Sequence, residues 1–206
     1  MTDVQGYRKK FGVIAPSTNT IVEPDFNAMG VPGVTSHTSR IHIRDQEIPD
    51  DDGMRHLLDQ NRAEIGPAVE RVKTAQPDYM VMGMSAETFW GGKEGSVLFE
   101  EGVREHIGDL GLTTGAEATR KALDCFGAKS LSVITPYPPV GDENVRQYFE
   151  EIGYEVKSVK GLNRPSATAI AETSIQEVLD AVREVDGDDV DAIIQCGTNL
   201  STVDLF

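Results

Sequence analysis

Cys196 is the residue of this chain whose position most clearly suggests chemistry. It closes the apolar run "DAIIQC" (191–196), and Gly197, Thr198 and Asn199 follow it in a cluster that predicts the start of a helix. A thiol at a helix N-terminus lies at the positive end of the helix dipole, which favours the thiolate and lowers the thiol pKa. We therefore expect Cys196 to exchange a proton with a ligand that the neighbouring N–H groups hold. The alternative is a buried and inert cysteine.

Cys125, the second of two cysteines, shows a different pattern. It lies in "KALDCFG" near the end of a helical pattern, where packing in the core is the expected role. Two cysteines argue against a disulfide framework, and the sequence has no C-x-x-C motif or His-rich cluster that would predict a metal site. This cysteine usage predicts a reducing, cytoplasmic location.

Three consecutive polar residues follow the first apolar run. In "APSTNT" (15–20), Ser17, Thr18 and Asn19 come after Pro16 and before a helical pattern. A helix N-cap explains one such residue well, but it does not explain three in a row. We therefore consider Ser17 and Asn19 candidates for substrate binding.

Two further apolar runs end in residues able to hold an anion. "MGMSAETFWGG" (82–92) contains Gly83 and Ser85 in a predicted tight turn, whose backbone N–H groups could bind a carboxylate. "TPYPPVGDEN" (135–144) places Tyr137 between prolines, where its phenol could donate to an oxyanion. Taken alone, the first segment is better explained as an ordinary glycine turn, and packing at the sheet rim is the alternative for Tyr137.

Short apolar runs alternate with amphipathic stretches along the whole chain. Strands are predicted over 10–16, 34–43, 78–84, 130–136, 154–162 and 191–196. Helical patterns lie over 57–72, 118–126 and 175–185, and Pro67 is predicted to begin a fresh helix after Gly66. This alternation predicts an α/β protein with mostly parallel sheets flanked by helices.

An internal echo predicts two similar βαβ halves. Residues 10–16 resemble 130–136, and residues 78–85 resemble 191–198. We place the N-terminal half at 1–114 and the C-terminal half at 115–206. Ligands of open parallel sheets bind beyond the carboxyl ends of the strands, so the active site is expected there, between the halves.

The composition excludes several classes of protein. A net charge of -15, from 34 acidic and 19 basic residues, argues against a nucleic-acid partner because phosphates would be repelled. No apolar run reaches the roughly 18 residues of a membrane span, and "MTDVQGYRKK" does not resemble a secretory signal. The acidity fits a salt-adapted protein and an ordinary cytosolic protein equally well.

The four strand ends together resemble a family. "PSTNT", "MGMSAETFWGG", "TPYPPVGDENV" and "IIQCGTNLSTVD" occur in the order and strand context of the aspartate/glutamate racemase superfamily, within its arylmalonate decarboxylase and maleate cis-trans isomerase branch. The resemblance covers nearly the whole chain. It implies a cofactor-independent enzyme that acts on a small dicarboxylate. Relatives continue through another strand and helix, so the C-terminal half is expected to lack its final strand and helix.

The resemblance also assigns expected roles to individual residues. Racemases and isomerases of this kind use two facing cysteines, of which Cys196 matches the second, while Gly83 or Met84 stands at the first. Arylmalonate decarboxylases likewise have glycine in the first half, but a hydroxyl residue stands where this chain has Met84. Asn163, in "KGLNRPS", resembles an isomerase asparagine that holds a carboxylate.

A single cysteine favours a reaction that needs only one proton donor. Racemisation requires an acid and a base on opposite faces, and isomerisation through a covalent adduct requires a nucleophile in the first half. Decarboxylation requires one donor, so we expect Cys196 to protonate an enediolate that Ser85 and Tyr137 stabilise. The substrate-binding residues are expected to be Ser17, Asn19, Gly83, Met84, Asn163, Gly197 and Thr198. Neither a cofactor nor a metal is needed.

Phe89 and Trp90 are expected to form the apolar pocket for the carboxylate that leaves.

The sequence leaves alternatives to the decarboxylase open. A maleate-type isomerase is the second reading, and a carboxylate-binding protein without turnover is the third. A Rossmann-type nucleotide protein is disfavoured, because no G-x-G-x-x-G follows the first strand. His37, His42, Arg40 and Arg44 are interpreted as a solvated face or a subunit contact of a homo-oligomer, ahead of contact with an anionic substrate.

Overall fold

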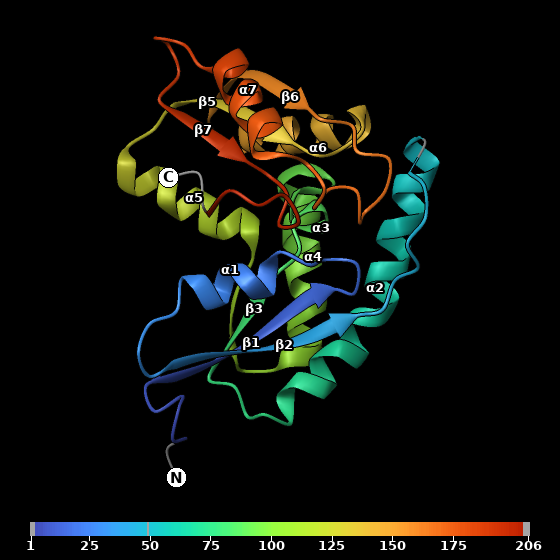
Figure 1. Ribbon diagram of the computed structural model, residues 1–206, viewed down its shortest axis with the longest axis vertical. Helices are drawn as coiled ribbons and strands as arrows, with labels where there is room; N and C mark the ends of the chain where they lie inside the picture. Colours follow the sequence, from blue (N-terminus) through green and yellow to red (C-terminus); the bar gives the residue numbers. More distant parts are fainter. Residues whose placement is uncertain (1–2, 49, 204–206) are drawn as a thin grey trace.

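Two parallel sheets, one in each half of the chain, organise the computed structural model, which describes residues 3–48 and 50–203 (Figure 1). The first sheet has the order β2-β1-β3-β4, and the second has the order β6-β5-β7. The strands are β1 (Lys9–Pro16), β2 (Val34–Ile41), β3 (Tyr79–Met82), β4 (Gly111–Thr113), β5 (Ser130–Thr135), β6 (Glu155–Gly161) and β7 (Ala192–Gln195). Every pair of neighbouring strands is parallel. The predicted α/β class is thus confirmed.

Helices cover both faces of the sheets, as the alternation of strands and helices predicts. They are α1 (Val22–Ala28), α2 (Asp51–Lys73), α3 (Ala86–Phe89), α4 (Gly92–Ile107), α5 (Gly115–Phe126), α6 (Pro139–Glu151) and α7 (Ile175–Val185). Within the residues that the structure describes, no helix is both long and apolar enough to cross a membrane.

Alternation along the strands decides which helix covers which face. Val13 and Ala15 of β1 pack with Val22 of α1. Ile14 points to the other face and joins the large cluster that contains Leu58 of α2. Successive side chains of a strand point to opposite faces, so this division follows directly from the sequence of β1. Figure 1 shows the same arrangement, with α1 and α2 on different sides of the sheet.

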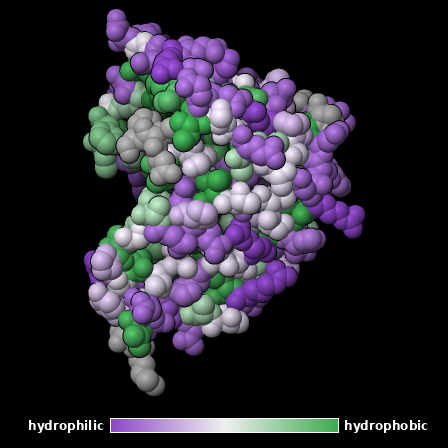
Figure 2. Space-filling model, viewed as in Figure 1, coloured by the Kyte–Doolittle hydropathy of each residue, from purple (hydrophilic) through white to green (hydrophobic). Residues whose placement is uncertain are grey.

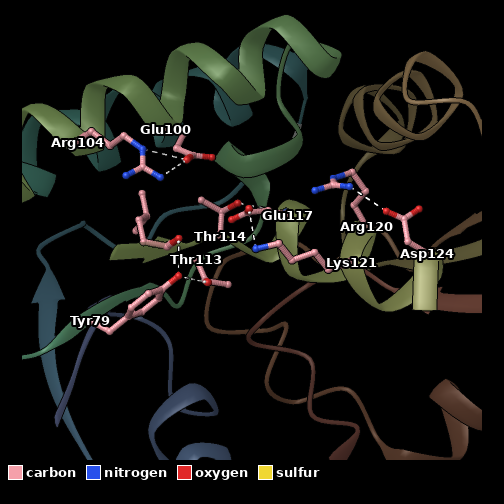
Figure 3. Close-up of polar contacts among 10 residues, drawn as sticks. Tyr79, Glu100, Arg104, Thr113, Thr114, Glu117, Arg120, Lys121 and Asp124 are labelled. Atoms are coloured by element: carbon pink, nitrogen blue, oxygen red, sulfur yellow. Dashed lines mark hydrogen bonds and ion pairs between the residues drawn. The ribbon is translucent and has the colours of Figure 1, made fainter. Parts of the chain in front are cut away.

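The junction between the halves lies at the end of β4. The Tyr79 hydroxyl donates to the carbonyl oxygen of Leu112 at 3.0 Å and shares a hydrogen bond with the Thr113 hydroxyl at 3.0 Å (Figure 3). Thr114 caps α5, because its Oγ1 accepts from the backbone N–H of Glu117 at 3.2 Å. These bonds fix the point where the chain leaves the first sheet for α5.

Ion pairs lie along the surfaces of the helices around this junction. Arg104 pairs with Glu100, and Arg120 pairs with Asp124, each four residues apart on its helix (Figure 3). Exposed pairs of this spacing stabilise a helix only slightly. Hydrophilic side chains also cover most of the molecular face in Figure 2, as the high charge content predicts.

The structure corrects two local expectations and adds one strand. Pro67 lies inside the continuous helix α2 and does not begin a new helix. Its side chain is exposed, so the carbonyl group that loses its N–H partner lies on the solvent side, where a proline is tolerated. Cys125, expected in the core, is exposed. The short strand β4 was not predicted, because three residues carry too little periodicity.

Candidate active site

A cavity of about 70 Å³ lies between the two halves, at the carboxyl ends of the strands. Ligands of open parallel sheets bind at this edge. The loops after β1, β3, β5 and β7 all contribute to its wall, through Thr18, Asn19, Met84, Ser85, Ala86, Tyr137, Pro138, Gly197, Thr198 and Asn199. Of the predicted site residues, the structure therefore brings Asn19, Met84, Ser85, Tyr137, Gly197 and Thr198 together around one cavity.

A hydrogen-bonded group from both halves forms the polar end of the cavity. Ser85 and Tyr137 share a hydrogen bond of 2.6 Å between their hydroxyl oxygens. The backbone N–H of Thr198 donates to Ser85 Oγ at 3.2 Å, and the Thr198 hydroxyl donates to the carbonyl oxygen of Gly83 at 3.2 Å. Burial is the main reason why the pKa of Tyr137 is raised above its usual value, so the phenol is a neutral donor at pH 7.

Asn19 has both a structural role and a place in the cavity wall. Its Oδ1 accepts from the backbone N–H groups of Ile21 at 3.0 Å and Val22 at 2.9 Å. These N–H groups at the start of α1 therefore have a hydrogen-bond partner. Its Nδ2 donates to Thr198 Oγ1 at 3.3 Å. Ser17, in contrast, is exposed, and its hydroxyl is bonded to the backbone of Ile43. The expectation that Ser17 binds substrate is not supported by this position.

Gly83 is required by packing and does not line the cavity. A Cβ atom there would lie 2.9 Å from Val22 Cγ1 and 3.1 Å from the carbonyl oxygen of Ile14. Met84, which is 3% exposed, lines the cavity instead. The first-half wall thus carries the thioether of Met84 beside the hydroxyl of Ser85.

Cys196 lies behind the cavity wall. Its backbone N–H donates to the carbonyl oxygen of Ile134 at 2.8 Å. Cys196 is 3% exposed and is not among the described residues that line the cavity. No α-helix follows β7 up to residue 203, so the predicted helix dipole is absent there. Burial, and secondly the negative charge of Asp142, raise the pKa of the thiol. The expectation of a lowered pKa is wrong, and the thiol is a neutral acid at pH 7.

Asp142 is a titratable group near the site that the sequence reasoning missed. It lies in the first turn of α6 and accepts a hydrogen bond from the Thr135 hydroxyl. Thr135 Oγ1 in turn accepts from the backbone N–H of Tyr137 at 3.1 Å. Burial raises the pKa of Asp142 above its usual value. Its place in the "TPYPPVGDEN" segment was the only signal that the sequence offered.

The apolar part of the cavity differs from the expected one. Ile43, Ile48, Met54, Leu57 and Ile170 form it. Phe89 and Trp90 are not among the described lining residues. Phe89 packs instead against Tyr148 and Phe149, with ring centroids 5.2 Å and 5.7 Å away. The aromatic pair from the "MGMSAETFWGG" turn therefore supports the core and not the substrate pocket.

Two loops, one from each half, close the cavity on its outer side. The backbone N–H of Ile48 donates to the carbonyl oxygen of Pro165 at 2.7 Å, and the Thr168 hydroxyl donates to Asp45 Oδ2 at 2.7 Å. Arg164 lines the cavity, whereas Asn163 is exposed with φ 47° and does not. The residue beside the predicted asparagine therefore takes the place in the wall.

The basic residues on and after β2 do not line this cavity among the described residues. Arg40 pairs with Glu23 at 2.5 Å and donates to the carbonyl oxygen of Asn19 at 2.6 Å. His37 Nε2 is hydrogen bonded to Thr35 Oγ1 at 3.0 Å. Neither residue lines the cavity, nor do His42 and Arg44, among the described residues.

The family model for arylmalonate decarboxylase matches residues 60–206. The chain belongs to the arylmalonate decarboxylase family. The resemblance that the four strand ends predict is thereby confirmed, and with it the expectation of an enzyme family of decarboxylases and cis-trans isomerases.

Among curated relatives, the maleate isomerase of Alcaligenes faecalis is 24% identical over 196 residues, which are 90% of this chain and 75% of that protein. The maleate isomerase of Nocardia farcinica is 22% identical over 206 residues, covering 96% of this chain and 79% of that protein.

Solved structures of both enzyme types share the fold of this family member. The Nocardia farcinica maleate cis-trans isomerase bound to TRIS superposes with a TM-score of 0.80 at 20% identity, covering 94% of this chain and 80% of that one. A mutant of the same isomerase carries a covalently bound succinylcysteine intermediate. A double mutant of arylmalonate decarboxylase in the liganded form has a TM-score of 0.76 at 16% identity, covering 95% and 80% of the two chains.

Proposed function

We propose that this protein is a cofactor-independent decarboxylase of a substituted malonate-type dicarboxylic acid. One observation carries the proposal: the first-half wall of the cavity presents Met84, while the buried thiol of Cys196 stands in the second half. None of the described first-half residues that line the cavity is titratable. A reaction that needs a single proton donor fits this asymmetry.

The polar end of the cavity suits one carboxylate of the substrate. Ser85 and Tyr137 share one hydrogen bond, so one of their two hydroxyl protons is left to donate to a ligand, and the Asn19 amide lies close by through its bond to Thr198. When carbon dioxide leaves, negative charge moves onto this carboxylate as it becomes an enediolate. Donors that are already in place stabilise that charge, and each contributes about 3 kcal/mol to lowering the barrier.

The second carboxylate leaves from the apolar side of the cavity. Ile43, Met54 and Leu57 there provide poor solvation for a charged group, which favours its loss as carbon dioxide. The carbon–carbon bond breaks with its electron pair moving into the enediolate. Cys196 then gives its proton to the carbon, and solvent restores the proton to sulfur. Burial raises the pKa of the Cys196 thiol, so the thiol carries its proton at pH 7 and is available as the donor.

Proton delivery requires the sulfur to reach the bound ligand. Cys196 is buried and is not among the described residues that line the cavity, whereas Tyr137 and Gly197 line it. The turn formed by Gly197, Thr198 and Asn199 must therefore shift when the ligand binds. Chemical labelling of Cys196 with and without a bound diacid measures this shift directly.

A maleate-type cis-trans isomerase is the second candidate, and the curated relatives favour it, because they are named maleate isomerases. Isomerisation through a covalent adduct needs a nucleophile on the first-half side, where this chain has Met84. A carboxylate-binding protein without turnover is the third candidate.

One assay separates the three candidates. The purified protein is incubated with maleate, the substrate of the isomerase, and with two substituted malonates: phenylmalonate, which carries an aryl group, and ethane-1,1,2-tricarboxylate, which carries a carboxymethyl group. Carbon dioxide and fumarate are then measured. The decarboxylase releases carbon dioxide from a malonate and forms no fumarate. Fumarate from maleate without carbon dioxide release contradicts the proposal and supports the isomerase. Binding of the acids without either product supports the non-catalytic protein.

A further inference from the structure

Arg164 carries a buried nitrogen without a hydrogen-bond partner at the wall of the cavity. Its backbone N–H donates to the carbonyl oxygen of Pro136 at 2.9 Å, which anchors the loop after β6 beside the site. The residue lines the cavity, yet its buried Nε has no hydrogen-bond partner among the described residues. A buried guanidinium N–H without a partner is costly, so a missing ligand or water group is the expected partner.

The guanidinium of Arg164 is held in place from its outer side. Nη2 donates to Glu177 Oε1 at 2.5 Å. The other carboxylate oxygen of Glu177 accepts from the backbone N–H of Ser174 at 2.9 Å and from its hydroxyl at 3.0 Å. The bond from Arg164 is the main cause that lowers the pKa of Glu177 to about 2, so this carboxylate is ionised at any pH near neutrality. The arrangement fixes the orientation of the guanidinium before any ligand arrives.

Asn61 provides a second unpartnered polar group from the opposite half. It lies on α2, is 3% exposed and lines the same cavity, and its Oδ1 is buried without a hydrogen-bond partner in the described structure. Rotation of the amide by half a turn would place the NH₂ group there, because the two ends of an amide have nearly the same shape. Asn61 and Arg164 are both separate from the group around Ser85 and Tyr137.

We propose that Arg164 is a specificity-determining residue that binds a carboxylate or carbonyl oxygen on the substituent of the substrate, with Asn61 as a second contact. The inference rests on the proposed function only in that it takes the Ser85–Tyr137 end as the seat of one carboxylate. It names the substrate class as acids that carry a further anionic or acceptor group on the substituent, in place of a bare aryl ring.

The group bound by Arg164 is one that the product retains. A guanidinium beside the departing carboxylate would stabilise its charge in the ground state and oppose its loss. Arg164 therefore pairs with a substituent group, and the departing carboxylate occupies the apolar part of the cavity. If the enzyme is instead the isomerase, the same residue holds the second carboxylate of the diacid, which that reaction also retains.

Binding measurements on non-reacting acids test this assignment. Succinate and propionate differ by one carboxylate, and both can place a carboxylate at the Ser85–Tyr137 end. We expect calorimetry to show that the wild type binds succinate about 10- to 100-fold more tightly than propionate, the range for one charge-assisted contact. Arg164→Gln should reduce this ratio to near one and leave propionate binding unchanged. Arg183→Gln, which removes the same charge from an exposed position of α7, should leave the ratio as it is.

The possible failures are distinguishable. An unchanged succinate-to-propionate ratio in Arg164→Gln, with propionate still bound, overturns the role of Arg164 and leaves the proposed carboxylate seat intact. Absence of binding of both acids to the wild type contradicts the seat and the role of Arg164 together. If Arg164→Gln does not fold, Asn61→Asp serves instead: a negative charge opposite the bound carboxylate should abolish the preference for succinate, and a retained preference contradicts the proposal.

Discussion

The protonation state of Cys196 depends on two neighbours of the sulfur: the apolar packing that buries it and the carboxylate of Asp142. Both favour the neutral thiol, burial more strongly than the charge. The same burial shields the sulfur from reagents, whereas Cys125 is exposed. At the scale of single residues, the proposed chemistry therefore depends on a thiol that stays protonated until its proton is used.

Replacing Asp142 by asparagine should make Cys196 easier to ionise. Removal of a nearby negative charge lowers the cost of forming the thiolate, so the pKa of Cys196 falls while staying above the usual value because of burial. Iodoacetamide labelling across pH, in a Cys125→Ser background, should show the labelling curve of Asp142→Asn shifted to lower pH. Glu143→Gln, a neighbouring exposed carboxylate, is the matched control. Labelling of Cys196 at pH 7 as fast as that of Cys125 in the wild type would refute the account of burial.

Glu87 should make the stability of the protein depend on pH. Its side chain is fully buried, Oε2 pairs with Arg62 at 3.0 Å, and Oε1 has no hydrogen-bond partner among the described residues. Burial raises the pKa from 4.5 to about 7, against the opposing charge of Arg62. The folded state therefore holds a proton that the unfolded chain releases, so stability falls as pH rises from 4.5 to 7 and then levels off.

The raised pKa of Glu87 corresponds to a loss of about 3 kcal/mol in the free energy of unfolding as the pH rises. Denaturant unfolding between pH 5 and 8 should show that the wild type loses stability relative to Glu87→Gln over this window. Glu94→Gln serves as a control on the neighbouring helix. Parallel pH profiles for the wild type and Glu87→Gln would contradict the buried, protonated carboxyl group.

At the scale of elements, sequence patterns predicted the buried strands better than the connections. The six predicted strands are rich in β-branched residues and are bounded by Gly, Pro or Asp, so their periodicity is a local property of the chain. The helix expected after Cys196 was inferred from a Gly-Thr-Asn cluster alone. There, Thr198 and Asn199 bond to the other half of the molecule, and these tertiary partners replace a helix cap.

The continuous helix α2 provides a test at this scale. Pro67 lacks the N–H that would bond to the carbonyl of Ala63, and a proline in a helix interior is unfavourable. Pro67→Ala should raise the free energy of unfolding by about 2 kcal/mol, because the restored hydrogen bond outweighs the greater freedom of the unfolded chain. Glu64→Ala changes no backbone bond and should have a much smaller effect. A loss of stability in Pro67→Ala would mean that the proline ring is needed at a bend in α2.

At the scale of the whole molecule, the two halves are joined at the site itself. Thr20 N–H donates to Asn199 Oδ1 at 2.9 Å, and Asn199 Nδ2 donates to the carbonyl oxygen of Thr18 at 3.4 Å. One large core cluster also includes Leu58 from the first half and Phe149 from the second. The cavity is therefore a product of the assembly of both halves and exists in neither alone.

The hydrogen bonds and the shared core between the two halves predict that the halves unfold together. Trp90, the only tryptophan, lies beside Asn144 and Val145 of the second half, so its fluorescence reports on the contact between the halves, while circular dichroism reports on helices of both. Because one core cluster spans the halves, the two probes should give the same denaturation midpoint. Separate midpoints would show that the halves fold independently and that their interface is weak.

The site could be predicted only in part from the sequence, because residues of both halves assemble it. Ser85, Tyr137 and Thr198 follow strands, and the edge of a parallel sheet gathers strand ends in a way that sequence alone reveals. Asn61 on a helix and Arg164 on a closing loop reach the cavity through tertiary packing, which no local pattern encodes. Asn163 and Arg164 are neighbours in sequence, and only the backbone conformation of the loop decides which one enters the wall.

The most direct test of the account is turnover by Cys196→Ala in D₂O, with the malonate that the wild type decarboxylates fastest. The wild type should release carbon dioxide and place one deuterium on the carbon that lost it. The variant should bind the acid with similar affinity but lose about 100- to 10,000-fold in rate, the usual contribution of a positioned proton donor. Turnover within a few fold of the wild type would contradict the claim that this single thiol protonates the substrate.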